Sequence, residues 1–471
     1  MVYPSIIQGG MGAGISNWRL ARAVSQLGQL GVVSGTALDQ VLARRLQDGD
    51  PGGHMRQALD HFPVPQIAER AWQTYFIPGG KAPRAAYKTV PMPGKGSFEQ
   101  VQDLCVLANF VEVFLARQGH NHPVGINYLE KIQAPHLASI YGAMLGGVGY
   151  ILMGAGIPIQ IPGILDRFVN HEAASYPLQV TGAQPGDDTS MTFDPRQVID
   201  GDPPPLTRPK FLAIIASNIL ATTMIKRATG AVNGFIIEGN TAGGHNAPPR
   251  GKLQLNELAE PIYGERDVVD LEKIRVLGLP FWLAGGYDNS VKLHEAKAAG
   301  AAGVQVGTAF AFCAESGLTP DYKNAILQKV KLGDADVFTD AQASPTGFPF
   351  KVVQLEGTMS EQELYEARPR ICDVGYLREA YRTADGRIEY RCASEPLTTY
   401  AAKGGNPEDA AGRKCLCNSL LANIGHAQIR NGKHIEVGLV TAGNALAGVQ
   451  RFLPHDGVSY TAADVIATLL Q

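Results

Sequence analysis

The sequence has few charged residues, few cysteines and no excess of positive charge. Charged residues make up 18% of the 471 residues, and 41 Lys and Arg against 44 Asp and Glu leave a formal net charge of −3. Without a basic field, nucleic acid is not an expected partner. The six cysteines are sparse, and no basic segment followed by an apolar run opens the chain. We therefore expect reduced thiols and a cytoplasmic protein.

One uncharged stretch, residues 142–165, is long enough to cross a bilayer. It is rich in glycine and is interrupted by Pro158 and Pro162. We interpret it as a helix end, a buried strand and a loop, so no membrane partner is expected. Across the whole chain, 54 Gly and 30 Pro imply many turns, which suits a fold of repeated strand–loop–helix units.

Eight short apolar runs, each ended by glycine or a polar residue, have the pattern of parallel strands buried on both faces. Helical patterns lie between many of them, at residues 17–27, 135–145, 218–228 and 290–299. This alternation predicts βαβ units, and eight of them favour a closed (β/α)₈ TIM barrel over a doubly wound open sheet. The predicted strands are residues 5–8, 31–34, 124–128, 149–153, 211–216, 233–238, 280–284 and 303–307.

Two spacings exceed a plain βα unit and indicate insertions after strands two and four, at about residues 50–118 and 165–209. The second contains a predicted hairpin, 178–181 with 190–193. We expect this insertion to cover the barrel mouth, because it leaves the C-terminal end of a strand, where barrel active sites lie. The barrel pattern ends near residue 345. The sequence thus predicts a barrel over residues 1–345 and an appended, mainly helical region over 346–471.

Glycine-containing loops follow predicted strands seven and eight. The first is Gly285-Gly286, with Asn289 or Ser290 capping the next helix, and the second is Gly307-Thr308. In barrels, free backbone N–H groups and two helix dipoles at these adjacent strand ends form the usual phosphate site. The sequence therefore predicts phosphate binding here.

The loop after strand one, residues 9–14, is also rich in glycine and lets backbone approach a flat or anionic ligand closely. Asn17 stands where a dinucleotide fingerprint needs its third glycine, and strand two ends in Ser34 rather than an acid. Dinucleotide binding is therefore disfavoured. A structural turn and a ligand contact fit this spacing equally well.

Strand six ends at Glu238 and leads through small residues to His245. Histidine exchanges a proton readily near neutral pH, and the preceding glycines leave room for a ligand, so we predict that His245 is catalytic. Arg250 lies nearby and could neutralise an anionic substrate, with solvated surface charge as the alternative.

Four cysteines fall in the C-terminal region: Cys372, Cys392, Cys415 and Cys417. Structural zinc normally uses pairs two to four residues apart, and only one close pair is present. We therefore prefer packed thiols to a metal site, and a Cys415–Cys417 redox pair is favoured still less.

Several of these motifs together resemble one family. YPSIIQGGMGAGIS, followed by LARAVSQLGQLGVVSG, resembles the N-terminal signature of the nitronate monooxygenases, formerly called 2-nitropropane dioxygenases. VGIN, IIEGNTAGGHN, FWLAGGYDN and GAAGVQVGTAF are similar in order and spacing, across about residues 4–312. The FMN-dependent enoyl-acyl-carrier-protein reductases share most of these motifs. The pair Asn240-Thr241 departs from the acidic-containing pair more common in the family.

The resemblance implies FMN as the cofactor and His245 as the active-site histidine. It implies a phosphate site at the loops after strands seven and eight, and further flavin contacts along the loops after strands one, three, five and six. The implied cofactor residues are Gly9, Gly10, Met11, Asn127, Ser217, Gly243, Gly244, Gly285, Gly286, Gly307 and Thr308. Separately from the resemblance, we predict Asn246 and Arg250, which follow His245, as substrate residues.

Three functions follow as hypotheses. The leading one is an oxidoreductase that converts alkyl nitronates with O₂ to a carbonyl compound and nitrite. The second is an NAD(P)H-dependent enoyl-thioester reductase that works with a carrier protein of a fatty-acid or polyketide synthase. The third is a flavin-binding regulatory protein without turnover. The sequence leaves open the physiological substrate and the oligomeric state, a homodimer included.

Overall fold

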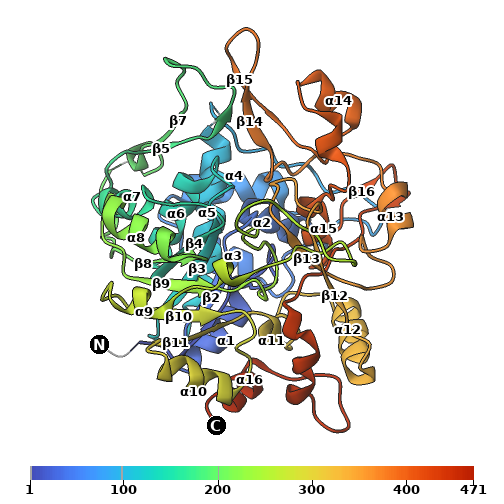
Figure 1. Cartoon of the computed structure of the whole chain (residues 1–471). Coiled ribbons are helices and arrows are strands. Elements are labelled where there is room, and N and C mark those ends of the chain that lie inside the picture. Colours follow the sequence, from blue (N-terminus) through green and yellow to red (C-terminus); the bar gives the residue numbers. More distant parts are fainter. Residues whose placement is uncertain (1–2, 97–98, 200) are drawn as a thin grey trace.

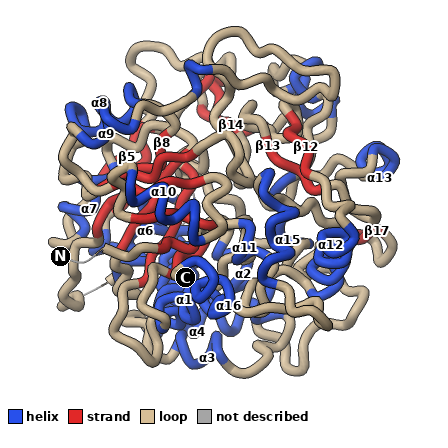
Figure 2. The backbone as a smooth tube through the Cα atoms, turned by 60° about the horizontal axis from the view of Figure 1, so that its bottom comes forward, coloured by secondary structure: helices blue, strands red, loops and turns tan. Residues whose placement is uncertain are grey.

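A computed structural model describes residues 3–96, 99–199 and 201–471. Its centre is a parallel sheet in the order β1-β11-β10-β9-β8-β4-β3-β2. The Gln8 N–H donates to the Leu30 carbonyl (2.9 Å) and the Leu30 N–H to that of Ile6 (3.1 Å), which closes the sheet into a barrel (Figures 1 and 2). The strands are β1 (Ile6–Gln8), β2 (Gly31–Ser34), β3 (Val124–Leu129), β4 (Tyr150–Gly154), β8 (Lys210–Ile215), β9 (Gly234–Glu238), β10 (Phe281–Ala284) and β11 (Gly303–Val306).

All eight predicted strands are present, so the predicted TIM barrel is confirmed. Its interior is filled by large apolar side chains from different strands, including Leu152, Leu212 and Trp282. The Trp282 Nε1–H donates to the Pro4 carbonyl at 2.8 Å, so this buried donor has a hydrogen-bond acceptor. The barrel is therefore a packed core, which leaves the loops at its ends to form a site.

Helices surround the barrel. Asn17 begins the first by accepting hydrogen bonds from the Arg19 and Leu20 N–H groups, the role expected of an N-cap residue. The stretch 142–165 is a helix end, a strand and the start of another helix, and in the described residues no helix has the length and apolarity to cross a membrane. The helices up to β11 are α1 (Trp18–Gln26), α2 (Leu38–Gln47), α3 (His54–Leu59), α4 (Pro65–Tyr75), α5 (Glu99–Ala116), α6 (His136–Leu145), α7 (Ile161–Phe168), α8 (Asn218–Arg227), α9 (Leu271–Arg275) and α10 (Ser290–Ala298), with the 3₁₀ turns η1 (Pro195–Gln197) and η2 (Glu265–Asp267).

The last outer position of the barrel is filled from the chain's C-terminus. The helix after β11, α11 (Thr308–Ala311), makes only one turn. The final helix, α16 (Ala462–Leu469), packs against α1, α10 and α11. Its buried residues Val465, Ile466 and Leu469 cover the outside of the barrel there. The C-terminal region therefore completes the barrel as well as extending it.

The two insertions differ in structure. The first contains α3, α4 and the 18-residue α5. In the second, β5 (Ala174–Pro177) pairs with β7 (Ser190–Phe193), so the predicted first strand of the hairpin, 178–181, is wrong by four residues. Ala174 and Tyr176 are the buried, alternating positions, and burial of this face sets the register. Residues 180–181 form β6, which instead pairs with β14 of the C-terminal region.

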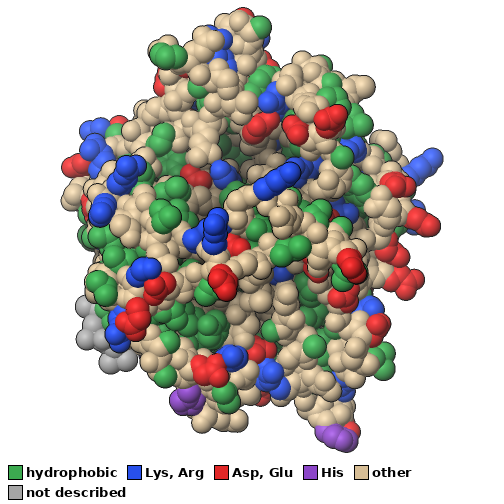
Figure 3. All heavy atoms as spheres, viewed as in Figure 1, with side chains coloured by type: hydrophobic (Ala, Val, Ile, Leu, Met, Phe, Trp, Pro, Cys, Tyr) green, Lys and Arg blue, Asp and Glu red, His purple; other side chains and the backbone are tan. Residues whose placement is uncertain are grey.

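The C-terminal region contains several short strands besides its helices. β12 (Val337–Asp340) pairs with β13 (Phe350–Val353), so a hairpin joins the two predicted regions across residue 345. β14 (Glu379–Arg382) pairs with β15 (Ile388–Arg391). On the face of the molecule drawn in Figure 3, Lys and Arg side chains are interspersed with Asp and Glu side chains. The remaining elements are α12 (Pro320–Leu332), α13 (Gln362–Ala367), α14 (Leu397–Ala402), η3 (Pro407–Ala410), α15 (Leu416–Ala422), β16 (Ile429–Arg430), β17 (His434–Ile435) and η4 (Asn444–Phe452).

Candidate functional site

A cavity of about 640 Å³ lies at the C-terminal ends of the barrel strands. The last residues of successive strands line it, among them Gly154 of β4, Ile215 of β8 and Val306 of β11. This volume is typical of sites for small molecules and cofactors. The cavity lies at the face of a TIM barrel where active sites form.

Most of the residues predicted for the site line this cavity. Two do not. The Ser217 hydroxyl accepts from the Leu220 N–H at 3.1 Å and caps α8, and Arg250 is exposed, with Nη2 donating to the Ala216 carbonyl at 3.1 Å. Those that the structure brings together are Gly9, Gly10, Met11, Asn127, Gly243, Gly244, His245, Asn246, Gly285, Gly286, Gly307 and Thr308.

The loops after β10 and β11 have the tight backbone expected of a phosphate site. Gly285 has φ +99°, and a Cβ there would lie 2.8 Å from Thr241 Oγ1, so a side chain is excluded. Asn289 caps α10 by accepting from the Lys292 N–H at 3.0 Å. The expected second helix dipole is weak, however, because α11 has only one turn. Binding of an anion would rest mainly on backbone N–H groups and α10.

A third loop, residues 441–443, which sequence reasoning missed, contacts the loops after β9 and β11. The Gly443 N–H donates to Thr308 Oγ1 at 2.8 Å, and the Gly244 N–H donates to Thr441 Oγ1 at 2.8 Å. A Cβ on Gly443 would lie 2.7 Å from the Thr241 carbonyl oxygen. Residues 441–443 therefore cross-link the loops after β9 and β11. The glycine at 443 was the only sequence signal for this close approach.

His245 is held by the segment that follows the barrel. Its Nε2 lies 2.7 Å from Ser344 Oγ, and its ring packs edge-on against Phe350 with centroids 4.8 Å apart. The Asn246 N–H donates to the Pro349 carbonyl at 2.9 Å. Burial lowers the pKa of His245 to about 4, so the imidazole is neutral at pH 7. A neutral ring can accept a proton but contributes no positive charge.

Glu238, the last residue of β9, also lines the cavity. Burial raises the pKa of this carboxyl to about 7, because a low-dielectric site disfavours the charged form. Sequence reasoning noted Glu238 only as the end of strand six. An acid at a barrel strand end was the available signal, but its titration depends on burial, which the sequence does not specify.

Several buried polar atoms of the cavity have no hydrogen-bond partner among the described residues. They include Asn127 Oδ1, Gln305 Oε1 and Asn246 Oδ1. Buried polar groups are normally hydrogen-bonded, so such a group set around one cavity indicates a polar ligand. A flat ring with a polar edge and a phosphate tail, as in FMN, matches this pattern of amides, glycine loops and helix terminus.

The C-terminal region forms much of the cavity's cover. Among the described residues of the second insertion, which was expected to cover the mouth, only Gln179 lines the cavity. The C-terminal region, residues 346–471, contributes the larger share: Phe348, Phe350, Tyr376, Leu377, Cys417, Leu420, Thr441, Ala442, Gly443 and Ala445.

Fold and site together define a TIM-barrel protein with a glycine-lined cavity and a histidine at its mouth. The model of the family described as nitronate monooxygenase matches residues 204–351. This segment contains His245 and the loops after β10 and β11, so the resemblance is confirmed there. No curated protein matches the sequence significantly.

Solved structures are similar to the whole chain at low identity. FabK from Thermotoga maritima is 17% identical, with 100% of this chain and 92% of that chain covered and a TM-score of 0.50. Nitroalkane oxidase from Streptomyces ansochromogenes is 14% identical, with 99% and 95% covered and a TM-score of 0.46. At this identity the FabK likeness bears on the fold alone.

Proposed function

We propose that this protein is an FMN-dependent oxidoreductase, and specifically a nitronate monooxygenase that uses O₂. One observation carries the proposal. His245, which lies within the segment matched by the nitronate monooxygenase family, faces the same cavity as the glycine loops after β10 and β11. Such a flavin site requires a proton-exchanging side chain and anion-binding backbone N–H groups at the same end of the barrel.

In this proposal the backbone N–H groups of Gly285, Gly286 and Gly307 hold the phosphate of FMN. Gly9, Gly10 and Asn127 line the same cavity; the two glycines would leave room for the flat ring, and Asn127 would offer it an amide. FMN, when bound, supplies the reversible uptake of electrons that no amino-acid side chain provides. The protein positions the substrate, excludes water and moves protons.

In this proposal His245 exchanges a proton with the substrate through Nδ1, because its Nε2 faces the Ser344 hydroxyl. Its lowered pKa keeps the ring unprotonated at neutral pH, and Ser344 orients it. The proposed reaction balances in atoms and charge: two nitronate ions and one O₂ give two carbonyl molecules and two nitrite ions. A neutral His245 gives an anionic substrate no positive charge, so backbone N–H groups of the cavity and Lys131, which also lines it, would balance that charge.

The test begins with the visible spectrum of the purified protein, where we expect bound FMN. The protein is then mixed anaerobically with NADPH and, separately, in air with a nitronate. The expected result is oxygen uptake and nitrite release with the nitronate alone, and no reaction with the neutral nitroalkane as control. Rapid flavin bleaching by NADPH would instead favour the enoyl-thioester reductase. Flavin that never turns over would favour the regulatory protein.

A further inference from the structure

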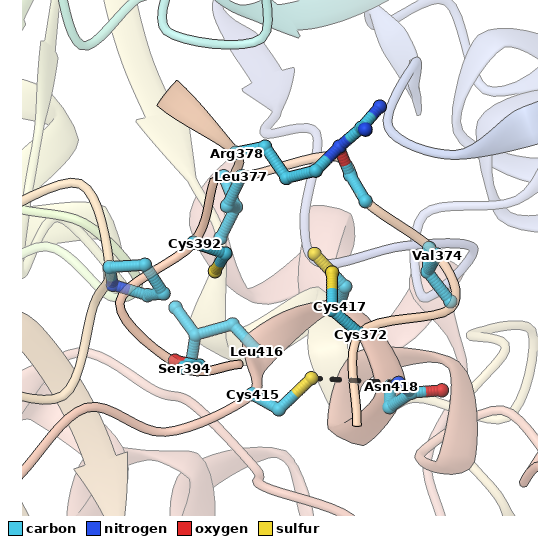
Figure 4. Close-up of a pocket in the computed structure, with 12 residues that line it drawn as sticks. Cys372, Val374, Leu377, Arg378, Cys392, Ser394, Cys415, Leu416, Cys417 and Asn418 are labelled. Carbon is cyan, nitrogen blue, oxygen red and sulfur yellow. Dashed lines mark hydrogen bonds between the residues drawn. The ribbon is translucent and has the colours of Figure 1, made fainter. Parts of the chain in front are cut away.

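Four of the six cysteines converge on one pocket outside the barrel. Cys372 precedes β14, Cys392 follows β15, and Cys415 and Cys417 lie at the start of α15 (Figure 4). All are free thiols. We propose that Cys372 and Cys392 form a reversible disulfide, a thiol redox site in the wall of the barrel mouth, with a low-molecular-weight disulfide such as glutathione disulfide as the oxidant.

The backbone around the pair is already held in place. Arg370 donates from Nη2 to the Ala393 carbonyl (2.5 Å) and from Nε to that of Glu395 (3.2 Å). These bonds join the segment of Cys372 to the segment of Cys392. The Ser394 hydroxyl donates to the Lys414 carbonyl at 2.9 Å and ties in the third segment. Pre-ordered segments lower the entropy lost when a disulfide closes.

The two thiols differ in reactivity. Interaction with the Cys392 thiol, assisted by the positive charge of Arg378, lowers the pKa of Cys372. The same interaction, together with burial, raises the pKa of Cys392. Cys372 is also the more accessible, being half-buried where Cys392 is buried. A half-buried thiol with a lowered pKa is the attacking partner, and its neighbour resolves the intermediate.

The other two thiols of the pocket are less suited. Burial raises the pKa values of both Cys415 and Cys417, and Cys415 Sγ accepts from Asn418 Nδ2 at 3.5 Å. Among the described residues, no group of three or more His, Cys, Asp or Glu side chains is arranged to hold a metal ion. The pair 372–392 is therefore the favoured reactive unit.

The reaction is a thiol–disulfide exchange. The Cys372 thiolate attacks one sulfur of glutathione disulfide, forms a mixed disulfide and releases one glutathione. Cys392 loses its proton and attacks Cys372 Sγ, which releases the second glutathione. Two protein thiols are oxidised to one disulfide, and one glutathione disulfide is reduced to two glutathione molecules.

The pair is connected to the barrel mouth through the residues that follow it. Tyr376 and Leu377, four and five residues after Cys372, line the large cavity, as does Cys417. Closing the disulfide constrains the wall that these side chains form. We expect oxidation to change the KM for substrate while the flavin content stays the same.

The test treats the full-length protein with glutathione disulfide, alkylates the remaining thiols and maps the peptides by mass spectrometry. The expected result is a loss of two free thiols, a linked pair of peptides carrying Cys372 and Cys392, and recovery with dithiothreitol. Cys372→Ser should abolish the link, whereas the control Cys313→Ser, outside the pocket, should leave it. The peptide map of the wild-type protein tests the link directly, so the result does not depend on whether a variant folds.

Three outcomes would overturn the proposal. They are retention of all free thiols, a link between Cys415 and Cys417 in place of the proposed one, and one equivalent of zinc that protects the thiols until it is chelated. None of these outcomes depends on turnover of the flavin. Failure of the nitronate assay and failure of this proposal are therefore distinguishable.

Discussion

The imidazole Nε2 of His245 lies 2.7 Å from the hydroxyl of Ser344, which stands 99 residues later in the chain. Ser344 Oγ lies in turn 2.8 Å from Thr346 Oγ1. The proposed proton acceptor is thus presented by a barrel loop but oriented by the segment that follows the barrel. A hydrogen bond at one imidazole nitrogen fixes the orientation of the ring and leaves the other nitrogen free to react.

Removing the imidazole should remove turnover and leave the flavin. We expect His245→Ala to lower kcat about 100-fold or more, the usual contribution of a positioned acid or base. Ser344→Ala should lower it by only about 2- to 10-fold, the value of one hydrogen bond. The measurements are nitrite release and flavin absorbance. Full activity in His245→Ala would refute the assigned role.

The charge of Glu238 should make substrate binding depend on pH. Its pKa of about 7 means that the carboxyl is neutral below pH 7 and negative above it. We expect the KM for an anionic nitronate to rise about fivefold from pH 6 to pH 8, since about 1 kcal/mol of repulsion is added. Glu238→Gln should flatten this profile, and the exposed control Glu257→Gln should not. If KM depends on pH as steeply in Glu238→Gln as in the wild-type protein, the charge of Glu238 is not the cause of that dependence.

The loop after β10 should not tolerate a side chain. Gly285→Ala adds both strain at a positive φ, of about 1–2 kcal/mol, and a clash with Thr241. Gly278→Ala is the matched control, because Gly278 also has positive φ (+75°) but open space around it. We expect both variants to lower the melting temperature and only Gly285→Ala to lose FMN. Equal flavin content in the two would contradict a phosphate site here.

The last helix should be required for stability of the barrel. Leu469 of α16 is 0% exposed and its neighbour Leu470 is 48% exposed. Leu469→Ala should lower the free energy of unfolding by about 2–5 kcal/mol, as expected for a buried leucine. Leu470→Ala should change it by less than about 0.5 kcal/mol. Denaturant unfolding followed by circular dichroism measures both, and similar losses would mean that α16 does not seal the barrel.

The barrel and most of its rim could be predicted because they are local in the sequence. Buried parallel strands are apolar runs, and glycine loops at their ends mark where backbone must turn tightly or approach a ligand. For this reason the strands, His245 and the loops at Gly285 and Gly307 were found. Two predicted site residues, Ser217 and Arg250, lie outside the cavity. The Ser217 hydroxyl caps α8, and the Arg250 side chain is exposed to solvent.

The amino-acid order alone determined the repeating βαβ pattern and the end of the barrel at which the site forms. Only the tertiary structure decided which distant segments complete the site at that end. The contact of Ser344 with His245, the loop at Gly443, the sealing helix α16 and the pocket that Cys372 and Cys392 share all bring together residues far apart in the chain or on separate elements. Such contacts depend on packing and burial rather than on local periodicity, and so do the pKa values of His245 and Glu238.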